Sequence, residues 1–190
     1  MKRTLRATFG LEKLRPGQAE VMRHVLEGSN TLAIMPTGAG KSLCYQLPTL
    51  HLPGTTVIVS PLISLMKDQV DALRASGIPA TFLNSTLAAS EARERFRGLH
   101  RNEFRLLYVA PERASTGHFR GLLGQAKVSL FAIDEAHCVS EWGHDFRPDY
   151  RLLRPLLDAF PDVPRLALTA TADAHTREDI LVQLGIPTDG

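Results

Sequence analysis

The chain has 190 residues, 44% of them hydrophobic, and a net charge of only +2. This length is enough for one domain with a full hydrophobic core, so we treat residues 1–190 as a single domain. The small net charge is a weak argument for a polyanionic partner, and any nucleic-acid site has to come from local clustering of basic side chains. The basic start lacks the apolar segment of a secretory signal, and no apolar run is long enough to span a membrane.

Two cysteines, Cys44 and Cys138, lie far apart in the sequence and lack the spacing of metal ligands. We interpret them as free thiols, which are typical of a reducing compartment. We therefore expect a cytoplasmic protein.

Short apolar runs alternate along the chain with segments of helical character. The predicted strands are residues 31–35, 56–60, 80–84, 105–109, 129–134 and 165–170. The predicted helices are residues 41–50, 62–76, 88–100, 114–125, 150–159 and 173–184. Nearly continuous apolar strands between helices predict an α/β fold, with a mostly parallel sheet and helices on both faces. The charged segment 91–101 is interpreted as a solvated helix, with contact to nucleic acid as the alternative.

Residues 31–42 read TLAIMPTGAGKS, which is an apolar strand followed by a glycine-rich turn and a lysine–serine pair. Gly38 and Gly40 allow the backbone to approach an anion closely. The N–H groups of the turn and the start of the next helix attract phosphate oxygens. The pattern predicts a loop that binds a nucleoside triphosphate. The loop residues are Thr37, Gly38, Ala39, Gly40, Lys41 and Ser42.

Two side chains of this loop have specific predicted roles. Lys41 reaches the β- and γ-phosphates, and the Ser42 hydroxyl is a ligand for Mg²⁺. The strict pattern of such loops has glycine where this chain has Met35. The alternative is an ordinary glycine-rich turn between a strand and a helix, which the second half of the site makes less favourable.

That second half is VSLFAIDEAH at residues 128–137, an apolar strand that ends in two carboxylates. Asp134 is the predicted Mg²⁺ ligand, because ligands bind at the carboxyl ends of parallel strands. Glu135 is the predicted general base that activates the attacking water. His137 is either a relay between this site and another bound partner or a structural histidine. A single aspartate after a strand could instead be the N-cap of a helix. The prediction therefore rests on the presence of two adjacent carboxylates.

Taken together, the motifs resemble the first motor domain of the RecQ-type DNA helicases of superfamily 2. The most diagnostic segment is CVSEWGHDFRPDY at residues 138–150, here called the aromatic loop, which is similar to the aromatic-rich loop that follows motif II in that family. The other matching segments are TFGLEKLRPGQ (8–18), TGAGKS (37–42), SPLISLMKDQV (60–70), LLYVAPERA (106–114), DEAH (134–137) and ALTATA (167–172). The resemblance covers almost the whole chain and implies a RecA-like P-loop NTPase fold.

The resemblance also implies that residues 1–28 recognise adenine. Gln18 has an amide that can donate to and accept from the edge of a base, and Arg15 packs on the base or steadies the segment. Many relatives have an aromatic residue where this chain has Leu11, so we expect weaker stacking on the base. The alternative for Arg15 and Gln18 is an ordinary helix start.

The aromatic loop contains the only tryptophan of the chain. Its predicted DNA-binding residues are Trp142, His144, Phe146 and Arg147. Aromatic rings stack on bases and cationic groups meet phosphates, which suits single-stranded DNA. The resemblance implies that DNA on this loop switches on ATP hydrolysis. The alternative is that Trp142 and Phe146 fill the core.

Further predicted contacts to the DNA backbone are Ser60, Lys67 and Gln69. For Lys67 the alternative is a solvent-facing position on a helix. Thr169 and Thr171 either link the two binding sites or cap the helix that follows them.

The resemblance implies the ATP-binding domain of an ATP-dependent 3′→5′ DNA helicase, with ATP and Mg²⁺ as cofactors and single-stranded or duplex DNA as partner. It also implies a monomer at the nucleoid with no membrane partner. We expect no second RecA-like domain, zinc module or winged helix within residues 1–190. We therefore expect the chain alone to bind nucleotide weakly and to show little DNA-stimulated hydrolysis. The alternatives are a truncated, non-catalytic module that binds nucleotide or DNA, and an RNA helicase of the DEAD/DEAH type.

Overall fold

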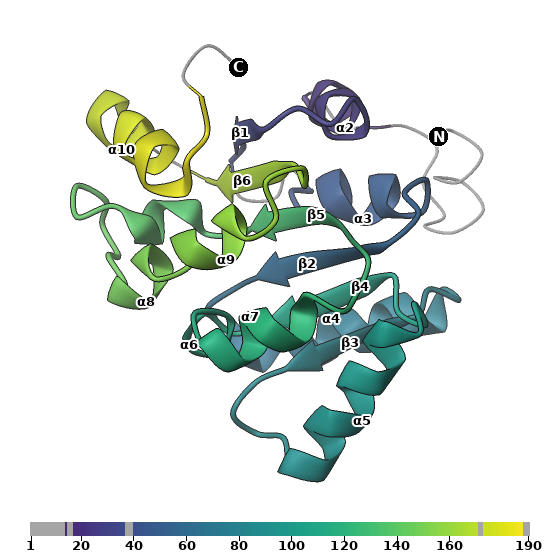
Figure 1. Cartoon of the computed structure of the whole chain (residues 1–190). Coiled ribbons are helices and arrows are strands. Elements are labelled where there is room, and N and C mark those ends of the chain that lie inside the picture. Colours follow the sequence, from purple (N-terminus) through teal and green to yellow (C-terminus); the bar gives the residue numbers. More distant parts are fainter. Residues whose placement is uncertain (1–13, 15–16, 37–39, 171–172, 188–190) are drawn as a thin grey trace.

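The computed structural model describes residue 14 and residues 17–36, 40–170 and 173–187. Within these ranges, six strands form one sheet in the order β1-β6-β5-β2-β4-β3 (Figure 1), and each neighbouring pair is parallel. The strands are β1 (Thr31–Ile34), β2 (Thr55–Val59), β3 (Ala80–Leu83), β4 (Leu106–Val109), β5 (Val128–Ile133) and β6 (Arg165–Thr169). The predicted parallel α/β sheet is confirmed, and all six predicted strands are present.

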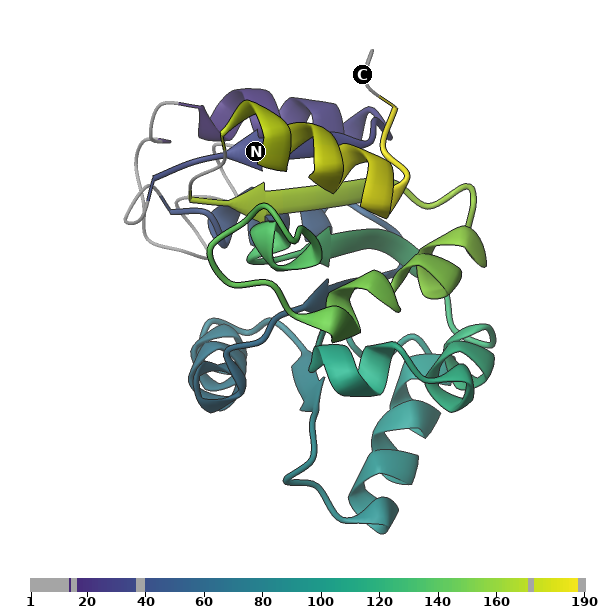
Figure 2. The same cartoon turned by 90° about the vertical axis from the view of Figure 1, so that its left-hand side faces the viewer.

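Helices connect consecutive strands, as parallel pairing requires. The helices are α2 (Gln18–Leu26), α3 (Leu43–Thr49), α4 (Ile63–Ala75), α5 (Ala89–His100), α6 (Pro111–Ala114), α7 (Gly117–Leu123), the 3₁₀ turn η1 (Ala136–Val139), α8 (Pro148–Arg151), α9 (Arg154–Asp158) and α10 (Ala174–Leu184). Figures 1 and 2 show them in two layers with the sheet between. Among the described residues, no helix combines the length and apolar character that crossing a membrane requires.

The side chains of β2 point alternately to the two faces of the sheet, and each face is covered by a layer of helices. Val57 and Val59 pack into one core with side chains from α5, α7 and α10. Ile58, between them, packs into the other core with side chains from α2, α3 and α4. Successive side chains of a strand point to opposite faces, so a strand buried on both sides reads as a continuous apolar run.

Two predicted helices are each divided in the structure. The segment 114–125 belongs to α6 and α7, because the Thr116 side chain accepts a hydrogen bond from Phe119 N at 3.1 Å and caps a new helix. The segment 150–159 belongs to α8 and α9, and Pro155 lies in the first turn of α9, where its missing N–H is tolerated.

One helix, α2, was not predicted, and another, α5, has the predicted charged and solvated side. α2 is not among the predicted helices, although a helix start at Gln18 is the stated alternative to adenine recognition; the helix buries Val21, Met22 and Val25. α5 is the predicted solvated helix, with a buried apolar side that includes Phe96 and Leu99. Its charged residues lie mainly on the exposed side.

Candidate functional site

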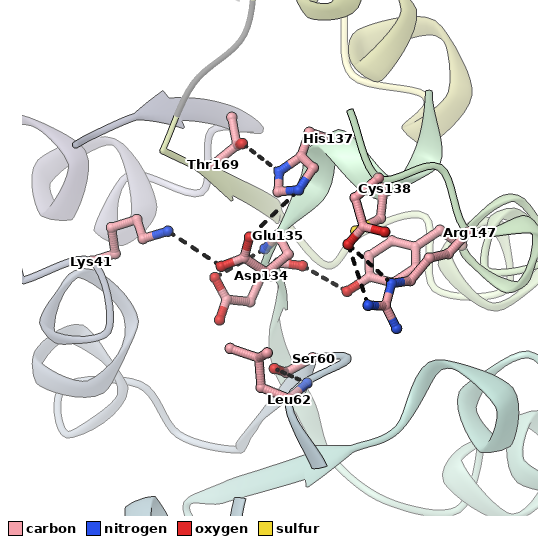
Figure 3. A network of polar contacts seen from close by, with 11 residues as sticks. Lys41, Ser60, Leu62, Asp134, Glu135, His137, Cys138, Arg147 and Thr169 are labelled. Atoms are coloured by element: carbon pink, nitrogen blue, oxygen red, sulfur yellow. Dashed lines mark hydrogen bonds and ion pairs between the residues drawn. The ribbon is translucent and has the colours of Figure 1, made fainter. Parts of the chain in front are cut away.

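The carboxyl ends of β1, β5 and β6 bring the two halves of the predicted site together. Lys41 follows β1, the pair Asp134–Glu135 follows β5, and Thr169 ends β6. These three strands are neighbours in the order β1-β6-β5, and their carboxyl ends share one edge because the sheet is parallel. Figure 3 shows the side chains converging at this edge.

The ammonium of Lys41 lies 3.5 Å from Glu135 Oε1, and the two side chains are only 18% and 24% exposed. Lys41 is held next to Gly40, whose φ of +75° favours glycine. The Gly40 carbonyl accepts a hydrogen bond from Gln18 Nε2 at 3.0 Å. Gln18 is therefore packed against the predicted phosphate loop, and its role toward adenine stays a prediction.

Several predicted residues lie outside the described part of the chain. They are Leu11, Arg15, Thr37, Gly38, Ala39 and Thr171. Ser42, the predicted hydroxyl ligand, stands at the start of α3, where its carbonyl accepts from Gln46 N at 3.0 Å.

The environment of Asp134 raises the pKa of its carboxyl. Burial, and then the neighbouring charge of Glu135, raise the pKa of Asp134 from 3.8 to about 6, against the opposing effect of Lys41. One carboxylate oxygen accepts from Glu135 N at 3.0 Å. A divalent cation with a preference for oxygen ligands, such as Mg²⁺, would relieve the cost of burying this charge, so the residues fit such an ion.

Glu135 and His137 extend the series of polar side-chain contacts that begins at Lys41. Glu135 has a left-handed backbone with φ of +52°, which is uncommon outside glycine. Its Oε2 lies 3.6 Å from His137 Nε2. His137 is buried, its Nδ1 lies 2.8 Å from Thr169 Oγ1, and burial is the main cause that lowers its pKa. A neutral His137 thus connects the carboxylate at the end of β5 to the hydroxyl at the end of β6.

The aromatic loop lies beside these contacts, and the rings of Trp142, His144 and Phe146 are exposed or half-buried. Trp142 is 69% exposed, which excludes the interpretation that it fills the core. The rings of His144 and His137 are stacked with centroids 4.4 Å apart. Phe146 is half-buried, and Arg147 forms an ion pair with Asp145 at 3.2 Å. The loop thus places the His144 ring against His137 and keeps Trp142 accessible.

Tyr150, the last residue of the aromatic loop, stands near the predicted DNA-binding residues in the sequence, but the sequence predicts no partner for it within the protein. It is fully buried, and its hydroxyl donates to the backbone carbonyl of Asp134 at 2.9 Å. Its position two residues after Pro148 is typical of a short helix. Nothing in the local pattern indicates a hydrogen bond to Asp134, sixteen residues earlier. The bond ties the end of the aromatic loop to the carboxylate pair.

Ser60 and Lys67 are less closely associated with the site. Ser60 is buried at the end of β2, and its Oγ accepts from Leu62 N at 3.2 Å. Lys67 has a side chain that is 71% exposed and pairs with Asp71 at 2.7 Å, in agreement with its alternative as a solvent-facing helix position. Their contacts to DNA stay predictions.

A family model described as DEAD/DEAH box helicase matches residues 15–180. The protein named "ATP-dependent DNA helicase RecQ" in Haemophilus influenzae is 50% identical over 182 residues, which cover 96% of this chain and 29% of that protein. The protein of the same name in Bacillus subtilis is 52% identical over 180 residues, covering 94% of this chain and 30% of that protein. This chain therefore spans less than a third of the length of these curated relatives.

The solved structure "Mycobacterium smegmatis helicase Lhr bound to ssDNA and AMP-PNP" superposes with a TM-score of 0.70 at 22% identity, over 91% of this chain and 24% of that one. At this identity the likeness shows the fold alone, which is the RecA-like helicase fold. The sequence matches confirm the resemblance to RecQ-type helicases. Since the family model spans most of its length, the chain belongs to the DEAD/DEAH box helicase family.

Proposed function

We propose that this chain is the ATP-binding motor domain of a RecQ-like ATP-dependent 3′→5′ DNA helicase, which couples ATP hydrolysis to the binding of single-stranded DNA. The observation that carries the proposal is the 3.5 Å approach of Lys41 Nζ to Glu135 Oε1. It joins the phosphate-loop lysine to the carboxylate pair, as one nucleotide site requires. The names of relatives about 50% identical support DNA as the polymer.

The residues at the strand ends have complementary roles in this proposal. Lys41 neutralises charge on the β- and γ-phosphates, and Ser42 with Asp134 holds Mg²⁺, which would supply further positive charge. Glu135 orients the attacking water and accepts its proton; a base of this kind contributes about 10²–10⁴-fold to the rate. His137 and Thr169 hold the Glu135 carboxylate in place through the contacts described above.

DNA binding is assigned to the aromatic loop. The exposed indole of Trp142 offers a face on which a base can stack, which contributes about 1–3 kcal/mol without sequence preference. His144 stacks on His137, which contacts Glu135. Movement of the loop on DNA binding would therefore reach the general base through two side chains.

A second RecA-like domain is the proposed partner for turnover. In P-loop ATPases an arginine supplied from outside the phosphate loop contributes about 10³–10⁵ to the rate. The relatives are more than three times as long as the matched region, which leaves room for such a domain in them. We also propose a monomer that acts at the nucleoid.

Turnover distinguishes this proposal from a non-catalytic binding module. Nucleotide binding is measured on the 190-residue chain with a fluorescent ATP analogue, and ATP hydrolysis is measured after adding the second motor domain of a RecQ relative, with and without single-stranded DNA. Lys41→Ala is expected to weaken binding, whereas Glu135→Gln is expected to retain binding and abolish measurable hydrolysis. Absence of hydrolysis by the wild-type pair, despite nucleotide binding, would favour the non-catalytic module.

The RNA helicase alternative is tested in the same assay. Replacing single-stranded DNA by RNA of the same length is expected to give little stimulation. Equal or greater stimulation by RNA would contradict the assignment to DNA.

A further inference from the structure

The helix that follows the end of β6 contacts the aromatic loop through one exposed residue. The rings of Trp142 and His175, the second residue of α10, are stacked with centroids 5.6 Å apart and planes 26° apart. Trp142 nevertheless remains 69% exposed. The imidazole therefore covers part of one side of the indole and leaves most of the ring accessible.

The backbone near each of the two rings is held by a local hydrogen bond. The side chain of Asp173 accepts from Thr176 N at 2.8 Å and caps the turn of α10 that carries His175. On the other side, the buried Ser140 accepts through its Oγ from Trp142 N at 3.1 Å. The backbone on each side of the stack is therefore held by a local hydrogen bond.

A second contact joins the same helix to the second aromatic residue of the loop. Asp179 follows His175 by four residues, so the two lie on one side of α10. Asp179 Oδ2 lies 3.6 Å from a terminal guanidinium nitrogen of Arg151. The guanidinium carbon of Arg151 is 5.2 Å from the ring centroid of Phe146, within the range of a cation–π contact.

We propose that His175 and Asp179 are positioning residues for single-stranded DNA, and that this side of α10 holds the rings of Trp142 and Phe146 ready to stack on bases. The inference rests on the DNA-binding role proposed above for the aromatic loop. A ring that is ordered before binding loses less conformational freedom when the DNA arrives, so its support increases affinity. Bases stack on the accessible side of Trp142, and His175 backs the ring without being displaced.

The stack itself is tested without DNA, because Trp142 is the only tryptophan of the protein. Intrinsic fluorescence of the intact chain therefore reports on one indole. His175→Ala is expected to change the emission intensity and to lower the steady-state anisotropy of Trp142, and His175→Phe is expected to restore the anisotropy. His118→Ala, which removes an exposed histidine from α7, serves as the matched control and is expected to leave both signals unchanged.

DNA affinity is then measured from the anisotropy of a fluorescein-labelled oligo(dT) at low salt. The free energy of a stacked aromatic pair, if all of it supports DNA binding, corresponds to about a three- to tenfold change in affinity for the oligonucleotide. His175→Ala is expected to weaken binding within this range, and His175→Phe to restore most of it. Asp179→Asn is expected to weaken binding by about two- to threefold, as for loss of a partly exposed ion pair. Trp142→Ala is the reference for the loop and is expected to weaken binding most.

Two outcomes separate this inference from the function on which it rests. If Trp142→Ala weakens binding while His175→Ala behaves like His118→Ala, the loop binds DNA and the supporting role of α10 is wrong. If Trp142→Ala leaves DNA affinity unchanged, the DNA role of the loop is wrong and the inference is overturned with it. Tighter DNA binding by His175→Ala would also overturn the inference, since it would mean that the stack competes with DNA.

Discussion

The ammonium of Lys41 and the carboxylate of Glu135 form a partly buried ion pair, 3.5 Å apart. The cation assigned to phosphate thus already has an anionic partner, and that partner is the proposed general base. Binding of a triphosphate has to compete with this pair, so nucleotide binding and the position of the base are coupled through one contact.

Glu135→Gln is therefore expected to bind ATP about two- to fivefold more tightly than the wild type, because Lys41 no longer has a competing carboxylate. The fluorescent ATP analogue gives the dissociation constant, and Glu112→Gln, an exposed glutamate on α6, is the control. Weaker binding by Glu135→Gln would show that the ion pair does not oppose the nucleotide.

Asp134→Asn is expected to stabilise the nucleotide-free protein at neutral and alkaline pH. The pKa of Asp134 is raised from 3.8 in the unfolded chain to about 6 in the folded protein. The folded state then binds more protons between these values, so wild-type stability falls as the pH rises through this window and stays reduced above it. Asparagine removes the buried charge and with it this loss.

The check is thermal unfolding in the presence of a chelator, at about pH 5 and about pH 8. The gain in melting temperature for Asp134→Asn over wild type is expected to be larger at the higher pH. The same substitution at the exposed Asp162 should give no such difference. A gain that does not depend on pH would contradict the assigned shift.

Tyr150→Phe removes one hydroxyl and leaves the buried ring in place. Loss of its bond to the Asp134 carbonyl is expected to lower the free energy of unfolding by about 1–2 kcal/mol. Because the bond holds the residue before Glu135, we also expect a lower kcat for ATP hydrolysis with little change in KM. Chemical denaturation of the chain measures the first effect, and steady-state kinetics after addition of the second motor domain of a RecQ relative measures the second.

Tyr108→Phe is the matched control for this change. Tyr108 is equally buried. Its hydroxyl accepts from Gln46 Nε2 at 3.0 Å and shares a hydrogen bond with the Tyr45 hydroxyl at 3.2 Å, away from the aromatic loop. Because this substitution removes two hydrogen bonds, we expect a loss of stability at least as large, without the fall in kcat. If both variants lose kcat equally, Tyr150 has only a structural role.

Gly143→Ala is expected to disturb the aromatic loop. A Cβ at this position would lie 2.8 Å from the carbonyl oxygen of His137, so the loop has to move. Overpacking of this kind costs about 1–3 kcal/mol, and we expect weaker binding of oligo(dT) together with a lower melting temperature. Gly121→Ala in α7, where the added Cβ meets nothing within 4 Å, is expected to leave DNA binding unchanged and to keep or raise the melting temperature, because alanine favours a helix over glycine.

The sheet was predictable from the sequence because each strand is a short, almost fully apolar run, and β2 and β4 are buried along their whole length. The helix boundaries within 114–125 and 150–159 were not predictable, because each depends on a single capping residue or proline inside a segment that is helical overall. α2 has a buried side of only a few residues, including Val21 and Val25, and starts at a glycine turn rather than at a polar cap.

The candidate site was predictable where it follows strand ends directly. Parallel strands place their carboxyl ends at one edge, so Lys41 and Glu135 meet although they are 94 positions apart in the numbering. Contacts made by side chains that enter from helices were not predictable. Tyr150 and His175 find partners in other elements, and neither has a local pattern that names them.

The most direct test of the shared nucleotide site is the Mg²⁺ dependence of ATP affinity in a double-mutant cycle of Lys41→Ala and Asp134→Asn. The wild type is expected to bind ATP more tightly as Mg²⁺ is added, and Asp134→Asn to lose that gain. With both groups acting on one bound nucleotide, the two substitutions are expected to be non-additive by about 0.5–3 kcal/mol. Full retention of the Mg²⁺ effect in Asp134→Asn, with additive losses in the double variant, would contradict a common magnesium–triphosphate site.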